Sequence, residues 1–245
     1  MGGGEGVGVV VAVGPNVKSM KVNDWVIPAT GQSGTWRTHV LAGEDQFDVV
    51  PNDIPVEYAA TLAVNPATAH HLLHQFVSLK AGDVIVQNAA NSACGQAVIQ
   101  LAKLQGVKTI NIIRDRPNYK EVVEQLKALG GDIVVSEDFA RSADFASVLA
   151  DLPKPVLALN AVGGASATEL ARFLDHNGTL VTYGGMGKQG VVVPTASLIF
   201  KQISLRGFWL THWNQTHPRA DRQRTILALA VRFGACVCVV AWALW

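Results

Sequence analysis

The chain has 245 residues, of which 49% are hydrophobic and 16% are charged, and its formal net charge is +1. This balance is typical of a globular protein and argues against a nucleic-acid-binding surface or a disordered tail. The length suffices for one large domain or two small ones. Three cysteines, Cys94, Cys236 and Cys238, are too few for a secreted disulfide framework and favour a reducing compartment. Met1 to Gly4 form no basic amphipathic leader, so we expect no transit peptide in this chain.

The first 62 residues predict short β-strands separated by turns. Strand-forming runs cover Val7–Val13, Val22–Pro28 and Asp48–Pro51. The pair Asn65-Pro66 then indicates a helix start, because asparagine caps helices well and proline suits the first helical position. We expect this helix to run to about Phe76.

A strand, a turn and a helix follow one another from residue 83. Val84 to Val86 predict a strand that is buried on both faces, Asn88 to Ser92 a polar turn, and a helix begins at Gly95. A helix start of this kind favours a pyrophosphate, because unpaired N–H groups and the positive end of the helix dipole lie there. The G-x-G-x-x-G fingerprint is incomplete, since Asn88 and Ala93 stand near the positions expected for glycines. Taken alone, the pattern also fits an ordinary strand-turn-helix unit.

Strands and helices alternate up to residue 208. Further strands are predicted over Thr109–Ile113, Ile133–Val135, Val156–Leu159, Thr179–Tyr183 and Ile203–Phe208. Helices are predicted over Lys120–Leu129, Asp144–Leu152 and Thr168–Leu174. This order predicts an α/β fold with a doubly wound parallel sheet, helices on both faces and right-handed crossovers. In such sheets a ligand binds at the carboxyl ends of the strands.

Two arginines flank Asp115 directly after the second strand of this series. About 20 residues after its glycine turn, a dinucleotide-binding fold contacts the adenosine ribose, where an acid favours NAD and arginine favours the 2′-phosphate of NADP. Arg114 and Arg116 outnumber the single carboxylate, and guanidinium–phosphate bonds are strong and often bidentate. We therefore predict NADPH as the cofactor. The alternative is a solvated charge cluster in a loop.

A second glycine pair follows the fifth strand, in the segment Tyr183-Gly184-Gly185-Met186. Glycines just past the carboxyl end of a strand let a ligand approach the backbone, here the nicotinamide. An ordinary Gly-Gly turn is the alternative.

The sequence does not predict a metal site or a serine hydrolase. His70, His71 and His74 lie on one predicted helix, but a zinc-protease motif would need glutamate at position 71. No G-x-S-x-G elbow follows a strand.

The last stretch, Ile226 to Trp245, carries a single charge, Arg232. A helix up to about Phe233 that meets a divergent apolar tail, Ala235–Trp245, is favoured. A membrane anchor is the less favoured alternative, because an arginine in the middle of a span is costly.

Seven motifs occur together in the order of one family. They are Thr35-Trp36-Arg37-Thr38, Val64-Asn65-Pro66-Ala67-Thr68-Ala69, Gln87-Asn88-Ala89 with Asn91-Ser92, Ile113-Arg114-Asp115-Arg116-Pro117, Leu159-Asn160-Ala161-Val162-Gly163-Gly164, Tyr183-Gly184-Gly185-Met186 and Arg206-Gly207-Phe208-Trp209-Leu210. Together they closely resemble the mitochondrial trans-2-enoyl-CoA reductases, zinc-free members of the medium-chain dehydrogenase/reductase superfamily. The resemblance covers about Gly4 to Phe233.

The resemblance implies three parts of the chain. These are a partial GroES-like all-β catalytic domain over residues 1–62, an NADPH-binding Rossmann domain over 63–212, and a C-terminal helix with the divergent tail over 213–245. It also implies a mitochondrial protein that forms a homodimer at full length. No nucleic-acid partner is implied.

The resemblance further implies which residues contact NADPH. These are Asn65 near the nicotinamide; Asn91, Ser92, Ala93 and Cys94 at the pyrophosphate; Arg114 and Arg116, with Asp115 between them, at the 2′-phosphate; and Tyr183, Gly184, Gly185, Met186, Phe208, Trp209 and Leu210 at the nicotinamide end.

The chemistry implied is reduction of a trans-2-enoyl thioester of CoA or acyl carrier protein to the saturated thioester, in mitochondrial fatty acid synthesis. A hydride passes from NADPH to the β-carbon, and the α-carbon is protonated. The family's tyrosine that assists this step precedes the segment matching Gly4-Glu5-Gly6, so we expect it upstream of Met1 and expect weak or no turnover from this chain. Ala93 and Cys94 also replace the family's Gly-Val. The alternatives are a quinone or alkenal oxidoreductase of the same superfamily and a non-catalytic NADPH-binding or interaction isoform.

Overall fold

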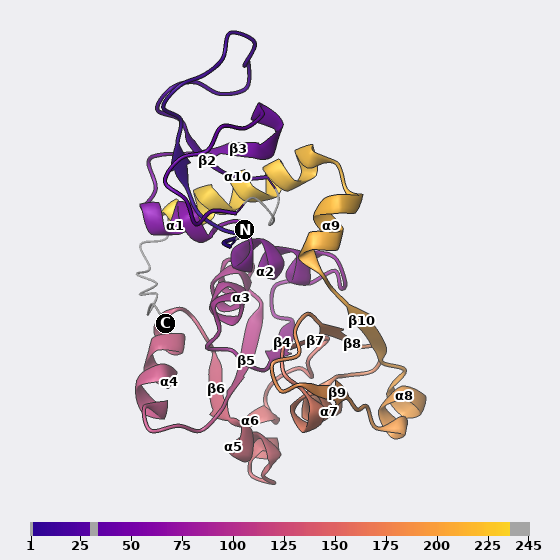
Figure 1. Ribbon diagram of the computed structural model, residues 1–245. Helices are drawn as coiled ribbons and strands as arrows, with labels where there is room; N and C mark the ends of the chain where they lie inside the picture. Colours follow the sequence, from indigo (N-terminus) through magenta and orange to yellow (C-terminus); the bar gives the residue numbers. More distant parts are fainter. Residues whose placement is uncertain (1, 30–33, 236–245) are drawn as a thin grey trace. The chain divides into compact units, whose positions relative to one another are not determined.

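The computed structural model describes residues 2–29 and 34–235, which belong to two compact units (Figure 1). One unit contains the described residues of Met1–Ala67 and of Trp209–Trp245, and the other is Thr68–Phe208. The C-terminal segment thus groups with the N-terminal one, whereas the sequence analysis set residues 213–245 apart.

The unit Thr68–Phe208 contains a six-stranded parallel sheet. Its strands are β4 (Val84–Gln87), β5 (Lys108–Ile113), β6 (Ile133–Ser136), β7 (Leu157–Asn160), β8 (Thr179–Thr182) and β10 (Ser204–Gly207), in the order β10-β8-β7-β4-β5-β6. The chain runs outward from β4 through β5 to β6, then returns and runs outward through β7 and β8 to β10. This confirms the predicted doubly wound sheet and places its reversal point between β4 and β7.

Helices cover both faces of this sheet (Figure 1). They are α3 (Ala93–Leu104), α4 (Tyr119–Ala128), α5 (Glu137–Arg141), α6 (Phe145–Leu149), α7 (Gly164–Phe173) and α8 (Thr195–Lys201), and α2 (Asn65–His74) leads into the unit. On one face Val84 and Val86 belong to a core cluster with Leu170 of α7. On the opposite face the Gln87 side chain donates to the Gly95 carbonyl of α3 at 3.0 Å. Every residue of β4 is therefore buried, which explains its continuous apolar run.

Three element boundaries differ from the sequence expectation. Helix α3 begins at Ala93 rather than Gly95, because the Ser92 side chain caps it by accepting the Gly95 N–H at 3.1 Å. The helix expected over Asp144–Leu152 is present but shorter, since α6 is capped by Asp144 and Ala150, and the separate helix α5 before it was not expected. Helix α7 begins at Gly164 rather than Thr168, because its first turn consists of small residues that carry little periodic signal.

The other unit contains a three-stranded antiparallel sheet. Its strands are β1 (Gly8–Val9), β2 (Trp25–Pro28) and β3 (Phe47–Val50), in that order. A 3₁₀ turn η1 (Glu44–Gln46) and helix α1 (Val56–Thr61) accompany it, and neither was expected. The strand expected over Val7–Val13 was wrong in length, since Val11 and Val13 are exposed and lie outside any strand. β-branched residues favour a strand, but only a paired neighbour makes one.

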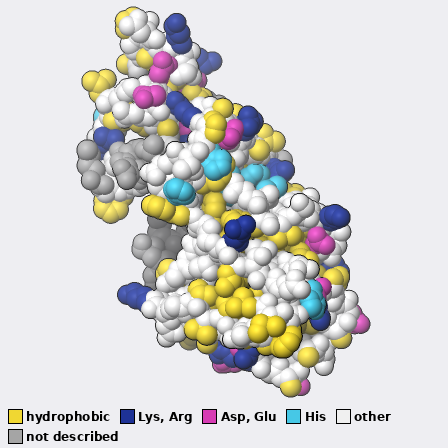
Figure 2. Space-filling model, turned by 90° about the vertical axis from the view of Figure 1, so that its right-hand side faces the viewer, with side chains coloured by type: hydrophobic (Ala, Val, Ile, Leu, Met, Phe, Trp, Pro, Cys, Tyr) yellow, Lys and Arg dark blue, Asp and Glu magenta, His cyan; other side chains and the backbone are white. Residues whose placement is uncertain are grey.

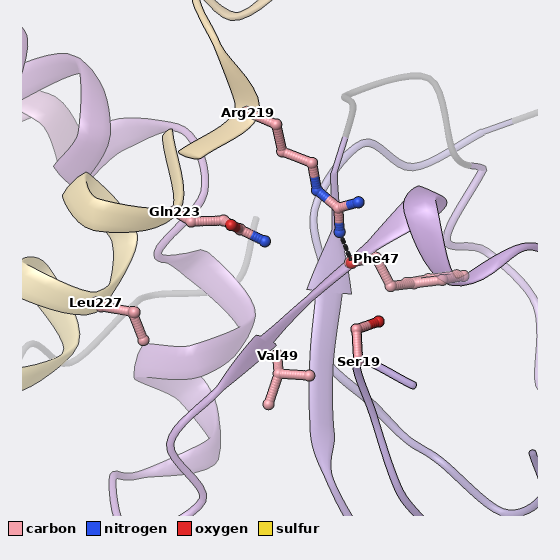
Figure 3. Close-up of a pocket in the computed structure, with 6 residues that line it drawn as sticks. All are labelled: Ser19, Phe47, Val49, Arg219, Gln223 and Leu227. Atoms are coloured by element: carbon pink, nitrogen blue, oxygen red, sulfur yellow. Dashed lines mark hydrogen bonds between the residues drawn. The ribbon is translucent and has the colours of Figure 1, made fainter. Parts of the chain in front are cut away.

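The C-terminal helix α10 (Arg219–Ala235), which follows α9 (Leu210–Thr216), packs on α1 and β3. Its charged first turns pair with Asp48 of β3, a side chain only 1% exposed. Arg219 Nε lies 2.9 Å from Asp48 Oδ1, and the buried Arg222 guanidinium contacts the other carboxylate oxygen. Figure 3 shows Arg219, Gln223 and Leu227 lining a small cavity together with β3. This charge pairing is one reason why the segment groups with the N-terminal unit.

No helix in the described part of the chain is both long enough and apolar enough to span a bilayer. The predicted tail lies outside the described residues, except for Ala235, and so do Cys236 and Cys238.

We predict that Asp48→Ala lowers the free energy of unfolding by about 3–5 kcal/mol, because it leaves the Arg222 charge buried without its carboxylate. Burial already lowers the pKa of Arg222 to about 10. Urea unfolding followed by circular dichroism measures the loss. Asp53→Ala, at an exposed position, is the matched control and should change little. Equal effects of the two substitutions would contradict a buried ion pair at Asp48.

Candidate functional site

The candidate site lies where the strand order reverses, at the carboxyl ends of β4 and β7. Asn88 follows β4, and its N–H donates to the Leu159 carbonyl of β7 at 3.2 Å. Two neighbouring strands whose connections leave in opposite directions create a crevice, and ligands of open α/β sheets bind there.

The turn that follows β4 brings backbone donors to this point. Ala89 adopts φ 48°, so the left-handed residue of the turn is an alanine, not Asn88 or Ala93. Ser92 accepts the N–H groups of Gly95 and Gln96, through its side chain and its carbonyl respectively. The N–H groups of the first two helical residues, Ala93 and Cys94, then have no partner within α3, which is the arrangement that binds anions.

Gly95 fixes how closely α3 approaches the turn. A Cβ at this position would lie 2.6 Å from the Ala90 carbonyl oxygen, which is too close for any side chain. Gly95 therefore does what one glycine of the dinucleotide fingerprint does, namely permit tight packing of helix against strand and turn.

The segment after β8 lies along the end of β7. Tyr183 N–H donates to the Asn160 carbonyl at 3.0 Å, and Met186 N–H donates to the Ala161 carbonyl at 2.9 Å. A Cβ at Gly184 would come within 3.2 Å of the Ala161 oxygen, whereas Gly185 has open space around it. The predicted segment Tyr183–Met186 is thus held beside the reversal point, with backbone open to a ligand at Gly185.

The Tyr183 side chain reaches the start of α3. Burial is the main reason that the pKa of Tyr183 lies well above its usual value, and Cys94 beside it raises it further. Burial likewise raises the pKa of Cys94 to about 12, so both groups are neutral at physiological pH. The Tyr183 hydroxyl is buried near Ser92 and Cys94, yet it makes no hydrogen bond of normal geometry within the described residues. A buried unsatisfied hydroxyl is costly, and a bound phosphate oxygen would relieve that cost.

The predicted charge cluster lies at the same edge of the sheet. β5 is parallel to β4 and beside it, and Ala90 N–H of the turn donates to the Ile112 carbonyl at 3.3 Å. Arg114 and Asp115 are exposed and Arg116 is half-buried. Asp115 accepts the backbone N–H of Arg116 at 2.9 Å, and neither guanidinium forms an ion pair among the described residues. Both cations are therefore available to an anion.

The remaining predicted residues divide between the units. Phe208 follows β10 at the same sheet edge, where its N–H donates to the Thr182 carbonyl at 3.0 Å and its ring packs near His71. Asn65, Trp209 and Leu210 belong to the other unit, where Asn65 opens α2 and Leu210 opens α9. The structure thus gathers Asn91–Cys94, Arg114–Arg116, Tyr183–Met186 and Phe208 at one sheet edge.

A family model described as zinc-binding dehydrogenase matches residues 93–241. The mitochondrial enoyl-[acyl-carrier-protein] reductase of Dictyostelium discoideum is 54% identical over 222 residues, which are 90% of this chain and 63% of that protein. A solved Etr1p/NADP/crotonyl-CoA complex has a TM-score of 0.89 and 37% identity, and covers 94% of this chain and 68% of that one. The mitochondrial 2-enoyl thioester reductase Etr1p/Etr2p heterodimer from Candida tropicalis has a TM-score of 0.89 and 36% identity. The match covers 96% of this chain and 70% of that one.

The chain belongs to the mitochondrial enoyl-[acyl-carrier-protein] reductase family. It spans 63% of the length of the Dictyostelium discoideum relative.

The residues gathered at the carboxyl ends of the strands fit a dinucleotide phosphate. The close approach at Gly95, the unsatisfied Tyr183 hydroxyl and the unpaired guanidinium groups each suit a bound phosphate. The description of the family model names zinc, but the described residues offer no comparable site for a zinc ion. Residues 2–29 and 34–235 contain no group of three or more histidine, cysteine, aspartate or glutamate side chains that could hold a metal ion. His70 and His74 instead stack on each other, with ring centroids 4.1 Å apart.

Sequence reasoning left three residues outside the predicted site. Asn88 and Asn160 are completely buried and joined by a 2.8 Å hydrogen bond. The signal that could have found them is a polar amide at or just past the end of two apolar strands. The third is Glu5, whose side chain accepts the Val64 N–H at 3.0 Å, immediately before Asn65.

We predict a pH-dependent stability that comes from Glu5. Burial raises its pKa from 4.5 to about 7, opposed by the hydrogen bond from Val64. The folded state therefore holds the proton more tightly than the unfolded state, and the free energy of unfolding falls as the pH rises from 4.5 to about 7. Glu5→Gln should abolish this contribution, on the order of 2 kcal/mol. Chemical unfolding at pH 4.5, 6 and 8 measures it.

The matched control is Glu57→Gln, at an exposed position of α1. Its unfolding free energy should follow that of the wild type at every pH. A Glu5→Gln curve parallel to the wild-type curve would refute the raised pKa.

Proposed function

We propose that this chain binds NADPH and that the protein reduces trans-2-enoyl thioesters of CoA or acyl carrier protein to saturated acyl thioesters. The observation that carries the proposal is the joint position of the α3 start, the buried Tyr183 hydroxyl and the Arg114–Arg116 pair at one sheet edge. The relatives support the substrate class, since the Etr1p structure is named as a complex with NADP and crotonyl-CoA. Their names also support a mitochondrial location and a role in fatty acid synthesis.

In this proposal the cofactor lies across the carboxyl ends of β5, β4 and β8. The pyrophosphate accepts hydrogen bonds from the N–H groups at the start of α3, in the segment Asn91–Cys94, because a helix N-terminus favours an anion. Arg114 and Arg116, with Asp115 between them, hold the 2′-phosphate through charge-assisted hydrogen bonds. The Tyr183 hydroxyl, which is protonated at neutral pH, donates a hydrogen bond to the cofactor.

The nicotinamide end rests on the glycine segment. Gly184 and Gly185 let the ring lie against backbone, and Met186, 81% exposed, offers apolar contact. Asn65, Phe208 and Trp209-Leu210 are proposed to contact this end as well. When bound, NADPH supplies the hydride that reduces the β-carbon of the enoyl thioester. The protein itself fixes the nicotinamide ring in position and excludes water around it.

We further propose a homodimer that forms through β10, the outermost strand of the parallel sheet. Among the described residues β10 pairs only with β8, so its outer edge is open. Leu205 lies on β10, and Ile199 and Phe200 lie on α8, the helix that precedes it; they are 45%, 61% and 70% exposed. Figure 2 shows hydrophobic side chains gathered on this side of the molecule. Such a patch beside an open strand favours pairing with a second copy.

The nucleotide preference tests the proposed function. We predict that Arg114→Ala with Arg116→Ala raises the Kd of NADPH more than tenfold, because each charge-assisted bond contributes about 1.5–3 kcal/mol. The Kd of NADH, which lacks the 2′-phosphate, should change less than threefold. Fluorescence titration measures both. Arg172→Ala, an exposed arginine of α7, is the control that should leave both values unchanged. Parallel losses for NADH and NADPH would count against the assignment.

Turnover separates the enzyme classes in the same preparation. NADPH oxidation is followed with a short trans-2-enoyl-CoA and, separately, with a quinone. Faster turnover of the enoyl thioester supports the proposal, whereas preference for the quinone assigns a quinone reductase. Binding of NADPH with no turnover of either substrate would identify a non-catalytic NADPH-binding form.

The dimer predicts a concentration-dependent sedimentation coefficient, which Phe200→Glu should remove because a carboxylate is costly in an apolar interface. Val148→Glu, on α6 with 41% exposure, is the control that should still dimerise. Identical sedimentation of wild type and Phe200→Glu would rule out a dimer that forms through β10.

A further inference from the structure

A buried pair of asparagines joins the two strands at the reversal point. Asn88 Nδ2 donates to Asn160 Oδ1 at 2.8 Å and to Ser166 Oγ at 3.1 Å. Asn88 Oδ1 accepts the backbone N–H of Ala161 at 2.8 Å. Asn88 therefore uses both amide protons and its oxygen, although its side chain is completely buried. A buried amide that is satisfied in this way can adopt few other positions.

The Asn160 side chain bonds through its oxygen more than through its amide protons. Its Oδ1 also accepts the N–H groups of Val162 at 3.1 Å and Gly163 at 3.0 Å, and its Nδ2 donates to Thr182 Oγ1 at 3.1 Å. Backbone N–H groups can only donate, so the oxygen of Asn160 must face them. The orientation of both amides follows, because Asn88 must then present its NH₂ group to Asn160.

The pair connects the two segments that approach the proposed cofactor. Asn88 is the first residue of the turn that leads into α3. The residues after Asn160 accept hydrogen bonds from the glycine segment, since Met186 N–H donates to Ala161 and Gly187 N–H donates to Val162. A shift of either amide would therefore move the phosphate turn relative to the segment 183–187.

We propose that Asn88 and Asn160 are positioning residues for NADPH, which hold the phosphate turn and the segment 183–187 at a fixed spacing. This inference rests on the proposed function. Neither side chain needs to touch the cofactor, because both act through the backbone that they bind. Arg114 and Arg116 follow β5, which receives no hydrogen bond from either asparagine side chain, so we expect the adenosine end of the site to depend little on the pair.

The hydrogen-bond pattern predicts different effects when each of the two asparagines is replaced by aspartate. Asn160→Asp keeps the acceptor for Val162, Gly163 and Asn88, and the Thr182 hydroxyl can turn to donate. Asn88→Asp loses both protons and places a carboxylate oxygen against Asn160 Oδ1. The same chemical change should thus be tolerated at position 160 and disruptive at position 88.

Two nucleotides distinguish positioning from general damage. NADPH requires both segments, whereas adenosine 2′-monophosphate, which lacks the 5′-phosphate, requires chiefly the arginines after β5. We expect Asn88→Asp to raise the Kd of NADPH at least tenfold and that of the monophosphate less than threefold, by isothermal titration. Asn160→Asp should change either value less than threefold.

The matched control is Asn111→Asp, a completely buried amide of β5 in the same sheet. Asn111 Nδ2 donates to Thr109 Oγ1 at 2.8 Å and to the Ile133 carbonyl at 3.1 Å, which an aspartate cannot do. This variant should lose stability but keep the wild-type ratio of the two Kd values. An unchanged ratio in Asn88→Asp as well would overturn the inference.

If Asn88→Asp fails to fold, Thr182→Val decides the question. This substitution keeps the β-branched shape in β8 but removes the hydroxyl that accepts from Asn160 Nδ2. It should raise the Kd of NADPH about threefold to tenfold and leave that of the monophosphate unchanged, and no change in either value would overturn the inference. A wild-type protein that binds neither nucleotide would instead overturn the proposed function on which the inference rests.

Discussion

The burial of strand β4 on both faces is the constraint on which the rest of this structure depends. Val84 and Val86 pack into the core under α7, while Ile85 and Gln87 face the side of α3. Gln87 and Asn88 at the end of the strand are completely buried, so their polar groups must find partners inside the protein. The partners lie on α3, on β5 and on β7, which ties three neighbouring elements to one strand end.

The site at that strand end contains two different electrostatic environments. Near α3 the ionisable groups are neutral, because burial raises the pKa values of both Tyr183 and Cys94. After β5 the charged groups are exposed or half-buried and unpaired with one another, as Arg114 and Arg116 show. The first environment offers oriented dipoles and the second offers mobile cations. A dinucleotide phosphate needs both, since its pyrophosphate lies close to backbone and its 2′-phosphate lies at the rim.

Ion pairs with a buried carboxylate stabilise the other unit, whereas the parallel sheet depends on apolar packing. Asp48 is buried between α10 and the small antiparallel sheet, with Arg219 and Arg222 on it and Gln223 at 2.9 Å. Arg222 also donates to the Pro28 carbonyl at 2.7 Å. A sheet of three short strands buries little apolar surface, and the helix supplies both the missing cover and the charges that fix its position. These bonds join residues more than 170 positions apart in the chain.

The sequence by itself determined the fold class and most elements of the parallel sheet, because a strand covered on both faces must be apolar throughout and the helices between strands keep their own period. It also predicted Asn91–Cys94, Arg114–Arg116 and Tyr183–Met186 as site residues, since each lies just after a strand that could be recognised locally. Only the tertiary structure decided which strands are neighbours, where their order reverses, and that α10 joins the N-terminal unit. Asn88 and Asn160 are 72 residues apart, and their bond exists only because β4 and β7 lie side by side. A local pattern records how each residue is buried, but it does not record the distant partner that satisfies a buried polar group.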